Sequence, residues 1–111
     1  MSGLTDRLDS IAEQLRLSLS AKDAARERAL PLCREVIRYS SHAIRAVHRQ
    51  EFGPARESLA AAGKLLDEVK QIIAECAELG YTGFVRDAEK EFAEGSLTLA
   101  LVTGKEPPGP G

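Results

Sequence analysis

The chain lacks most of the signatures that mark common enzyme, redox and membrane proteins. It has 111 residues, no tryptophan and 5% aromatic residues, and its two cysteines are too far apart for a CxxC motif. It contains no glycine-rich phosphate loop and no nucleophile elbow, which excludes self-contained active sites of those kinds. Its apolar runs are only a few residues long, so the sequence predicts no helix that spans a bilayer.

An excess of charge of one sign is also missing from the chain as a whole. Fifteen Lys and Arg stand against 17 Asp and Glu, for a formal net charge of −2. The signs are separated along the chain, however. Residues 22–56 hold eight basic and four acidic side chains, whereas residues 57–111 hold five basic and ten acidic ones. This separation predicts one basic and one acidic surface on the same molecule.

The N-terminus and the cysteines bear on the cellular compartment. Asp6 and Asp9 interrupt the first leucines, and no basic-then-apolar signal pattern is present, so we expect a cytoplasmic protein. Cys33 and Cys76 each lie on the apolar face of a helical pattern. Their positions favour buried free thiols over a disulfide.

Helix-forming residues and helical periodicity dominate the rest of the sequence. Hydrophobic residues make up 43% of the chain and charged residues 29%, with abundant Ala, Leu, Glu and Arg. A first apolar stripe has a spacing of three and four and comprises Leu4, Leu8, Ile11 and Leu15. A second stripe continues with the same spacing and comprises Leu30, Cys33, Ile37, Ser40, Ile44 and Val47. Between them, Pro31 either kinks one long helix or begins a new one.

Two further helices are predicted after a turn at residues 52–54, where Gly53 is expected to supply the special backbone conformation. The second helix is expected from about Pro54 to Leu79, with Gly80 as its C-cap. Its seam comprises Leu59, Ala62, Leu66, Val69, Ile73 and Cys76. Thr82 is expected to N-cap the third helix. The apolar face of that helix comprises Phe84, Val85, Ala88, Phe92, Leu99 and Val102.

Together these elements predict an all-α antiparallel bundle of three long helices that forms oligomers. The helical domain is expected to occupy residues 1–102, followed by an unstructured Pro/Gly-rich tail at residues 103–111. Gly95 lies inside the third helical pattern and is expected to weaken that helix by about 1 kcal/mol relative to Ala. Three wide apolar faces in so small a chain are more than one copy can cover, which is why we expect self-association.

Four arginines fall on one helical stripe, within about 60° of one another on a helix that turns by about 100° per residue. They are Arg34, Arg38, Arg45 and Arg49. Ser41 falls in the same stripe, His48 lies beside it, and Glu35 is expected to point elsewhere. Guanidinium groups match phosphate oxygens, so the stripe predicts a surface for nucleic acid. The alternative is an ordinary solvated face with arginines that lie along the helix.

Three carboxylates fall on one face of the third helix, namely Asp87, Glu91 and Glu94. Carboxylates that project together can hold Mg²⁺ or Mn²⁺, and such a cation can bind a phosphate and activate a water molecule. The alternative is a solvated face in which Lys90 pairs with Glu94 and Arg86 pairs with Asp87 or Glu89. On spacing alone, this alternative is favoured because two glutamates three residues apart are common on helices.

Two segments, residues 26–49 and residues 81–95, resemble the translin family in this order, particularly its archaeal-type members. The first reads RERALPLCREVIRYSSHAIRAVHR and the second YTGFVRDAEKEFAEG, with a Leu- and Ala-rich helix between them. The resemblance covers about residues 24–106. It implies an all-helical fold, closed oligomers and binding of single-stranded RNA or DNA. The family includes translin and translin-associated factor X, and the factor X branch implies a Mg²⁺-dependent endoribonuclease.

The resemblance also assigns roles to residues. Glu91 and Glu94 match the family's catalytic Glu-x-x-Glu pair, and the four arginines match basic positions of its first long helix. Family members are about twice as long, with further acidic ligands in their C-terminal helices. The chain is therefore a fragment, a truncated form or a natural short form, and its metal site is expected to be incomplete. The leading expectation is a translin-like protein that binds single-stranded nucleic acid. The alternative is a helical self-association or interaction module without such chemistry.

Overall fold

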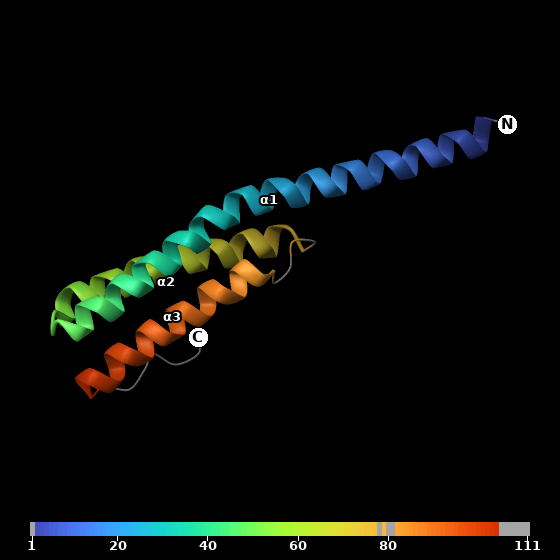
Figure 1. Ribbon diagram of the computed structural model, residues 1–111. Helices are drawn as coiled ribbons and strands as arrows, with labels where there is room; N and C mark the ends of the chain where they lie inside the picture. The colour runs from blue at the N-terminus through green and yellow to red at the C-terminus, as the bar shows by residue number, and fades with distance from the viewer. Residues whose placement is uncertain (1, 78, 80–81, 105–111) are drawn as a thin grey trace.

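The protein folds into three α-helices, as seen in a computed structural model that describes residues 2–77, 79 and 82–104. The helices are α1 (Ser2–His48), α2 (Phe52–Glu75) and α3 (Gly83–Thr103). Successive helices run in opposite directions (Figure 1). The expected all-α architecture of three long helices is therefore confirmed, and no strand occurs among the described residues. None of these helices, over the same residues, combines the length and hydropathy needed to cross a membrane.

Helix α1 is the long axis of the molecule, which measures 74 × 22 × 17 Å. It packs against both α2 and α3, which contact each other much less. Its first half extends alone beyond the bundle (Figure 1). In this rod, residues 3–24, every side chain is exposed except the half-buried Ser18. Pro31 lies inside α1. The structure therefore shows one long helix and not a new helix that begins at the proline.

The buried seam of α1 consists mainly of small side chains. Its members are Ala25, Ala29, Cys33, Val36, Ser40, Ala43, Ala46 and Val47. The predicted seam was right at Cys33, Ser40 and Val47, but Leu30, Ile37 and Ile44 are only half-buried. Because α1 lies against two helices at once, its most enclosed positions hold residues that allow close approach of the backbones.

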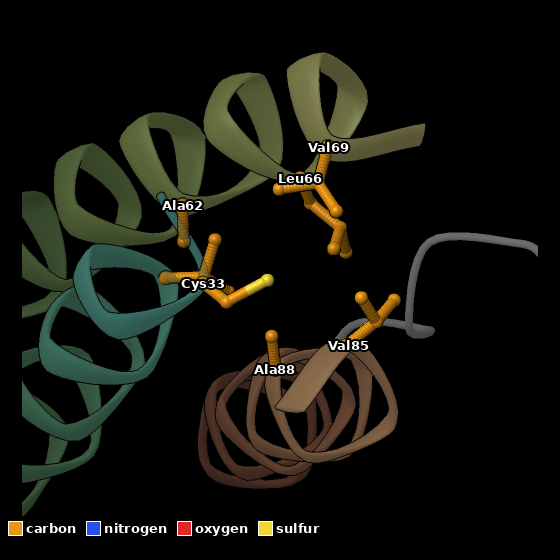
Figure 2. Close-up of a cluster of buried hydrophobic side chains, with 7 residues drawn as sticks. Cys33, Ala62, Leu66, Val69, Val85 and Ala88 are labelled. Carbon is orange, nitrogen blue, oxygen red and sulfur yellow. The ribbon is translucent and has the colours of Figure 1, made fainter. Parts of the chain in front are cut away.

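The core between the three helices is a cluster to which each contributes (Figure 2). The side chain of Cys33 in α1 points into the space between Leu66 and Val69 of α2 and Val85 and Ala88 of α3. The predicted seam of α2 is confirmed from Leu59 to Val69, although its last buried member is Ile72 rather than Ile73. In α3, Phe84, Phe92 and Leu99 are half-buried as side walls of the core, whereas Val102 is 55% exposed.

The turn between α1 and α2 is built differently from the prediction. Gln50 has a φ of 63°, and the N–H of Glu51 donates to the carbonyl of Ala46 over 2.8 Å. This is a Schellman-type helix end with Gln50, not a glycine, in the left-handed position. Gly53 and Pro54 lie within the first turn of α2, so the prediction of a turn centred on Gly53 was wrong.

The two ends of α3 agree only in part with the prediction from the sequence. Thr82 is the N-cap residue in extended conformation, but its hydroxyl makes no capping hydrogen bond. Gly104 ends the helix in the left-handed conformation, with its N–H bonded to the carbonyl of Ala100. Thr103, which the prediction placed in the tail, is the last residue of α3. The predicted cap at Gly80 and the tail at residues 105–111 lie outside the described residues.

Candidate nucleic-acid interface

The four arginines of the stripe all lie exposed, three on the C-terminal half of α1 and one directly after its last residue, and we call them the arginine face. It comprises Arg34, Arg38, Arg45 and Arg49. By helical geometry this face is opposite the buried seam around Val36 and Ser40, so folding leaves it open to solvent. The structure shows that all four side chains are exposed. Whether they bind nucleic acid stays a prediction.

One acidic side chain shares the edge of this face, contrary to the expectation that Glu35 points elsewhere. The Nε of Arg38 donates to Glu35 Oε2 over 3.0 Å, and a second guanidinium nitrogen donates to the same oxygen. Residues three apart are neighbours on a helix surface, and the arginine reaches across. The hydrogen bond from Arg38 lowers the pKa of the Glu35 carboxyl, and the same contact raises the pKa of Arg38. A phosphate would have to compete with this carboxylate for Arg38.

Tyr39 is a feature of the interface that the sequence interpretation missed. The guanidinium of Arg38 lies over its ring, 4.5 Å from the ring centroid. The ring itself is half-buried and packs against the core cluster. Arg38 is thus held between an anion on one side and an aromatic face on the other. The Arg-Tyr pair in the sequence is the only signal that pointed to this arrangement.

The other members of the arginine face are free of such partners. Among the described residues, no ion pair involves Arg34, Arg45 or Arg49. Arg45 and the exposed His48 lie in the last turn of α1, where cationic groups also stabilise the negative end of the helix dipole. Ser41 is half-buried beside the face. Among the described residues, three guanidinium groups without an ion-pair partner therefore lie along one side of α1 and its C-terminal end.

The carboxylates of α3 do not assemble into a metal site within the described chain. Asp87 and Glu94 are exposed and Glu91 is half-buried. Lys90 Nζ lies 3.9 Å from Glu94 Oε1, which is the ion pair that the alternative reading expected. No group of three or more His, Cys, Asp or Glu side chains that could hold a metal occurs among the described residues. These residues therefore do not by themselves fit Mg²⁺, and no catalytic step is derived through a metal.

Glu89 is the acidic residue of α3 that faces the interior, and nothing in the sequence pattern singled it out. Its Oε1 is buried without a hydrogen-bond partner. Burial raises the pKa of the Cys33 thiol to about 11, and the nearby Glu89 carboxylate adds to the rise. Cys33 is a buried free thiol, as predicted, whereas Cys76 is half-buried rather than buried. A thiol with so high a pKa stays protonated near neutral pH and is a poor nucleophile.

In comparisons with known proteins, no family model, curated protein or solved structure matches this chain. The likeness to the translin family therefore rests on the two segments of the sequence alone.

Proposed function

We propose that the chain is a translin-like, self-associating protein that binds single-stranded RNA or DNA through the arginine face. The observation that carries the proposal is the exposure of three unpaired arginines, Arg34, Arg45 and Arg49, on the side of α1 that faces away from the core. Guanidinium groups bind phosphate oxygens in pairs of hydrogen bonds, and each neutralised phosphate releases counterions. A strand that follows the axis of α1 would meet these groups in succession.

Arg38 has a different role in this proposal. Its guanidinium is already fixed by Glu35 and by the ring of Tyr39. Such a group is positioned in advance but partly neutralised, so it contributes less to affinity than an unpaired arginine. Single-stranded nucleic acids also bind aromatic faces, but the Tyr39 ring is covered by Arg38. We therefore assign the affinity to phosphate contacts rather than to base stacking.

The test is binding of fluorescently labelled 20-nucleotide RNA and DNA at several salt concentrations. Replacing Arg45 and Arg49 by Ala should weaken binding and reduce the slope of log K against log salt by about 1.4, because two single-strand phosphate contacts are lost. The matched control removes two exposed lysines from α2, Lys64→Ala with Lys70→Ala. Equal losses in the two variants would show that only general charge matters and would overturn the assignment to this face.

Self-association without nucleic-acid chemistry is the second candidate, and it too has a specific observation in its favour. The rod exposes six large hydrophobic side chains, each 53–62% accessible: Leu4, Leu8, Ile11, Leu15, Leu17 and Leu19. Four of them, Leu4, Leu8, Ile11 and Leu15, form one apolar stripe, and an exposed stripe of this kind marks a surface for association. Oligomers that show no affinity for the labelled strands at low salt would favour this candidate over the first.

A nuclease activity remains what the resemblance implies for Glu91 and Glu94. In the described chain they lack a third ligand, so a Mg²⁺-dependent endoribonuclease would require donors from residues outside this group. Metal binding by these carboxylates is the first step to test.

A further inference from the structure

The rod carries an apolar stripe that nothing in the described structure covers. The stripe consists of Leu4, Leu8, Ile11 and Leu15, all of them more than half exposed. A helix of about 20 residues that packs against nothing is marginal in water, because most helical stability comes from burial of an apolar face. The rod is therefore the part of the molecule with most to gain from a partner.

The stripe is the continuation of a face that is already used for helix packing. From Leu15, steps of three and four lead through Ser18 and Lys22 to Ala25 and Ala29. Ala25 and Ala29 are buried in a cluster with Ile72 of α2. Where α2 ends, the same face of α1 passes uncovered into the rod (Figure 1). Its spacing of four and three is that of a coiled-coil seam.

We propose that two copies of the chain pair through their rods as a short antiparallel coiled coil. In this pairing Leu8 packs against Ile11 of the second copy, and Leu4 packs against Leu15. The inference deepens the self-association that forms part of the proposed function, and it does not require that nucleic acid binds. Both partners use the same surface, so the pairing closes on itself as a twofold dimer.

The direction of pairing follows from what α2 already covers. From Ala25 onward, the seam of α1 is occupied by α2. In a parallel pair the two three-helix bundles would meet at the same end of the coil, on the same face, and would compete for space. In an antiparallel pair the bundles lie at opposite ends, and the partner rod stays within residues 1–18. The antiparallel arrangement is the one that the fold accommodates.

The register follows from the polar residues that end the stripe. Four apolar layers form when Leu8 faces Ile11, because Leu4 then faces Leu15. A shift by one heptad would set Leu4 against Lys22 and Leu8 against Ser18, which would bury an ammonium group in an apolar layer. The register with four apolar layers is therefore favoured.

Charges beside the stripe fit a second copy better than a partner of opposite charge. The flanking positions hold Thr5, Arg7, Ala12 and Gln14. In the antiparallel pair Arg7 comes opposite Gln14, so no like charges meet. The acidic residues of the rod, such as Asp9 and Glu13, lie on the outer face, away from the seam. A nearly neutral, self-complementary border does not select a charged partner.

The experiment measures the mass of the whole chain in solution by light scattering and sedimentation. At about 100 μM the wild type should approach twice its 12.0 kDa mass and should dissociate on dilution to about 1 μM, as a small apolar interface does. Leu8→Glu should lower the dimer population at least tenfold. Leu17→Glu is the matched control, because Leu17 is as exposed as Leu8 but lies off the stripe, and it should leave the dimer intact.

A charge-exchange pair tests the direction and register. Leu8→Glu and Ile11→Lys should each be monomeric alone, and an equimolar mixture should restore the dimer, because the antiparallel register sets these two positions against each other. Circular dichroism checks that the bundle remains folded in every variant. A monomeric wild type at 100 μM would overturn both the rod pairing and self-association. Oligomers that Leu8→Glu leaves intact, or a mixture that stays monomeric, would overturn the rod pairing while self-association stands.

Discussion

Gly95 of α3 lies directly against the backbone of Ser40 in α1. A Cβ placed on the glycine would come within 3.4 Å of the Ser40 carbonyl oxygen and 3.0 Å of Leu59 Cδ2. Ser40 itself is fully buried, and its hydroxyl has no hydrogen-bond partner. A side chain at position 95 would therefore touch the backbone of α1 at ordinary van der Waals distance and would crowd Leu59 of α2.

The variant Gly95→Ala should lower the free energy of unfolding by about 1–3 kcal/mol, because the added methyl group crowds the side chain of Leu59, whose Cδ2 would lie 3.0 Å away. Helix propensity alone predicts a gain of about 1 kcal/mol, so the sign of the change decides between the two effects. Urea denaturation measures it. Gly53→Ala is the control, since a Cβ there meets nothing within 4 Å, and it should be neutral or stabilising. A stabilised Gly95→Ala would show that Leu59 moves aside for the added methyl group.

The end of α1 offers a stabilising substitution. Gln50 holds a φ of 63°, which costs a residue with a Cβ about 1 kcal/mol and costs glycine almost nothing. Gln50→Gly should therefore raise the free energy of unfolding by about 1 kcal/mol in thermal or urea denaturation. Gln71→Gly, at an exposed helical position of α2, should lower it by about the same amount. Destabilisation by Gln50→Gly would contradict the Schellman-type end.

The thiol of Cys33 makes stability depend on alkaline pH. Its pKa is raised to about 11 from 9.0. Below pH 9 the thiol is protonated in the folded and the unfolded chain, so it has no effect there. As the pH rises from 9 towards 11, the unfolded chain loses this proton first, and stability falls. Urea midpoints at pH 8 and pH 10 should therefore differ more for the wild type than for Cys33→Ala. An equal pH dependence in both would contradict the assignment.

The pairing of Arg38 with Glu35 predicts a variant that binds nucleic acid more tightly. Glu35→Gln removes the carboxylate that competes with phosphate for Arg38, so affinity for single-stranded RNA should rise several-fold at low salt, and less at high salt. Glu57→Gln removes the same charge at an exposed position of α2 and is the control for the effect of net charge alone. If the two variants gain equally, Arg38 does not take part in binding.

The sequence predicted helices and faces well because both depend on local periodicity. The seam of α2 from Leu59 to Val69 and the exposure of the arginine face follow from spacing alone. In α1, where two helices pack against one, spacing did not suffice. There the structure buries Val36 and Ala43 in preference to Ile37 and Ile44, because close approach selects small volume over hydrophobicity.

The features that the sequence did not predict depend on contacts between helices or on side-chain reach. Glu89 and Cys33 are distant in sequence, and only the packing of α3 against α1 brings the Glu89 carboxylate close enough to raise the pKa of the Cys33 thiol. Gly95 looks unfavourable by helix propensity until its neighbours are known. Glu35 and Arg38 are three residues apart and are therefore neighbours on the helix surface. The prediction that Glu35 points elsewhere considered only its angular position and not the length of the arginine side chain.

The last prediction concerns Glu91 and Glu94, for which the resemblance implies a role in holding a divalent cation. Since the described residues supply no third donor, Mn²⁺ should bind the wild type only weakly, at about millimolar concentration, and Glu91→Gln with Glu94→Gln should abolish that binding. Isothermal titration or the relaxation of water by Mn²⁺ measures both. Asp67→Asn with Glu68→Gln removes the same charge from two exposed positions of α2 and should leave Mn²⁺ binding unchanged.

The same variants separate metal binding from catalysis. Removing two carboxylates lowers the negative charge of the molecule, so RNA affinity of the Glu91→Gln, Glu94→Gln double variant should be equal to or higher than that of the wild type. Equal, negligible Mn²⁺ affinity in the wild type and the double variant would make the pair a solvated face on which Lys90 neutralises Glu94. Cleavage of RNA by the double variant as fast as by the wild type would rule out a catalytic role for these carboxylates.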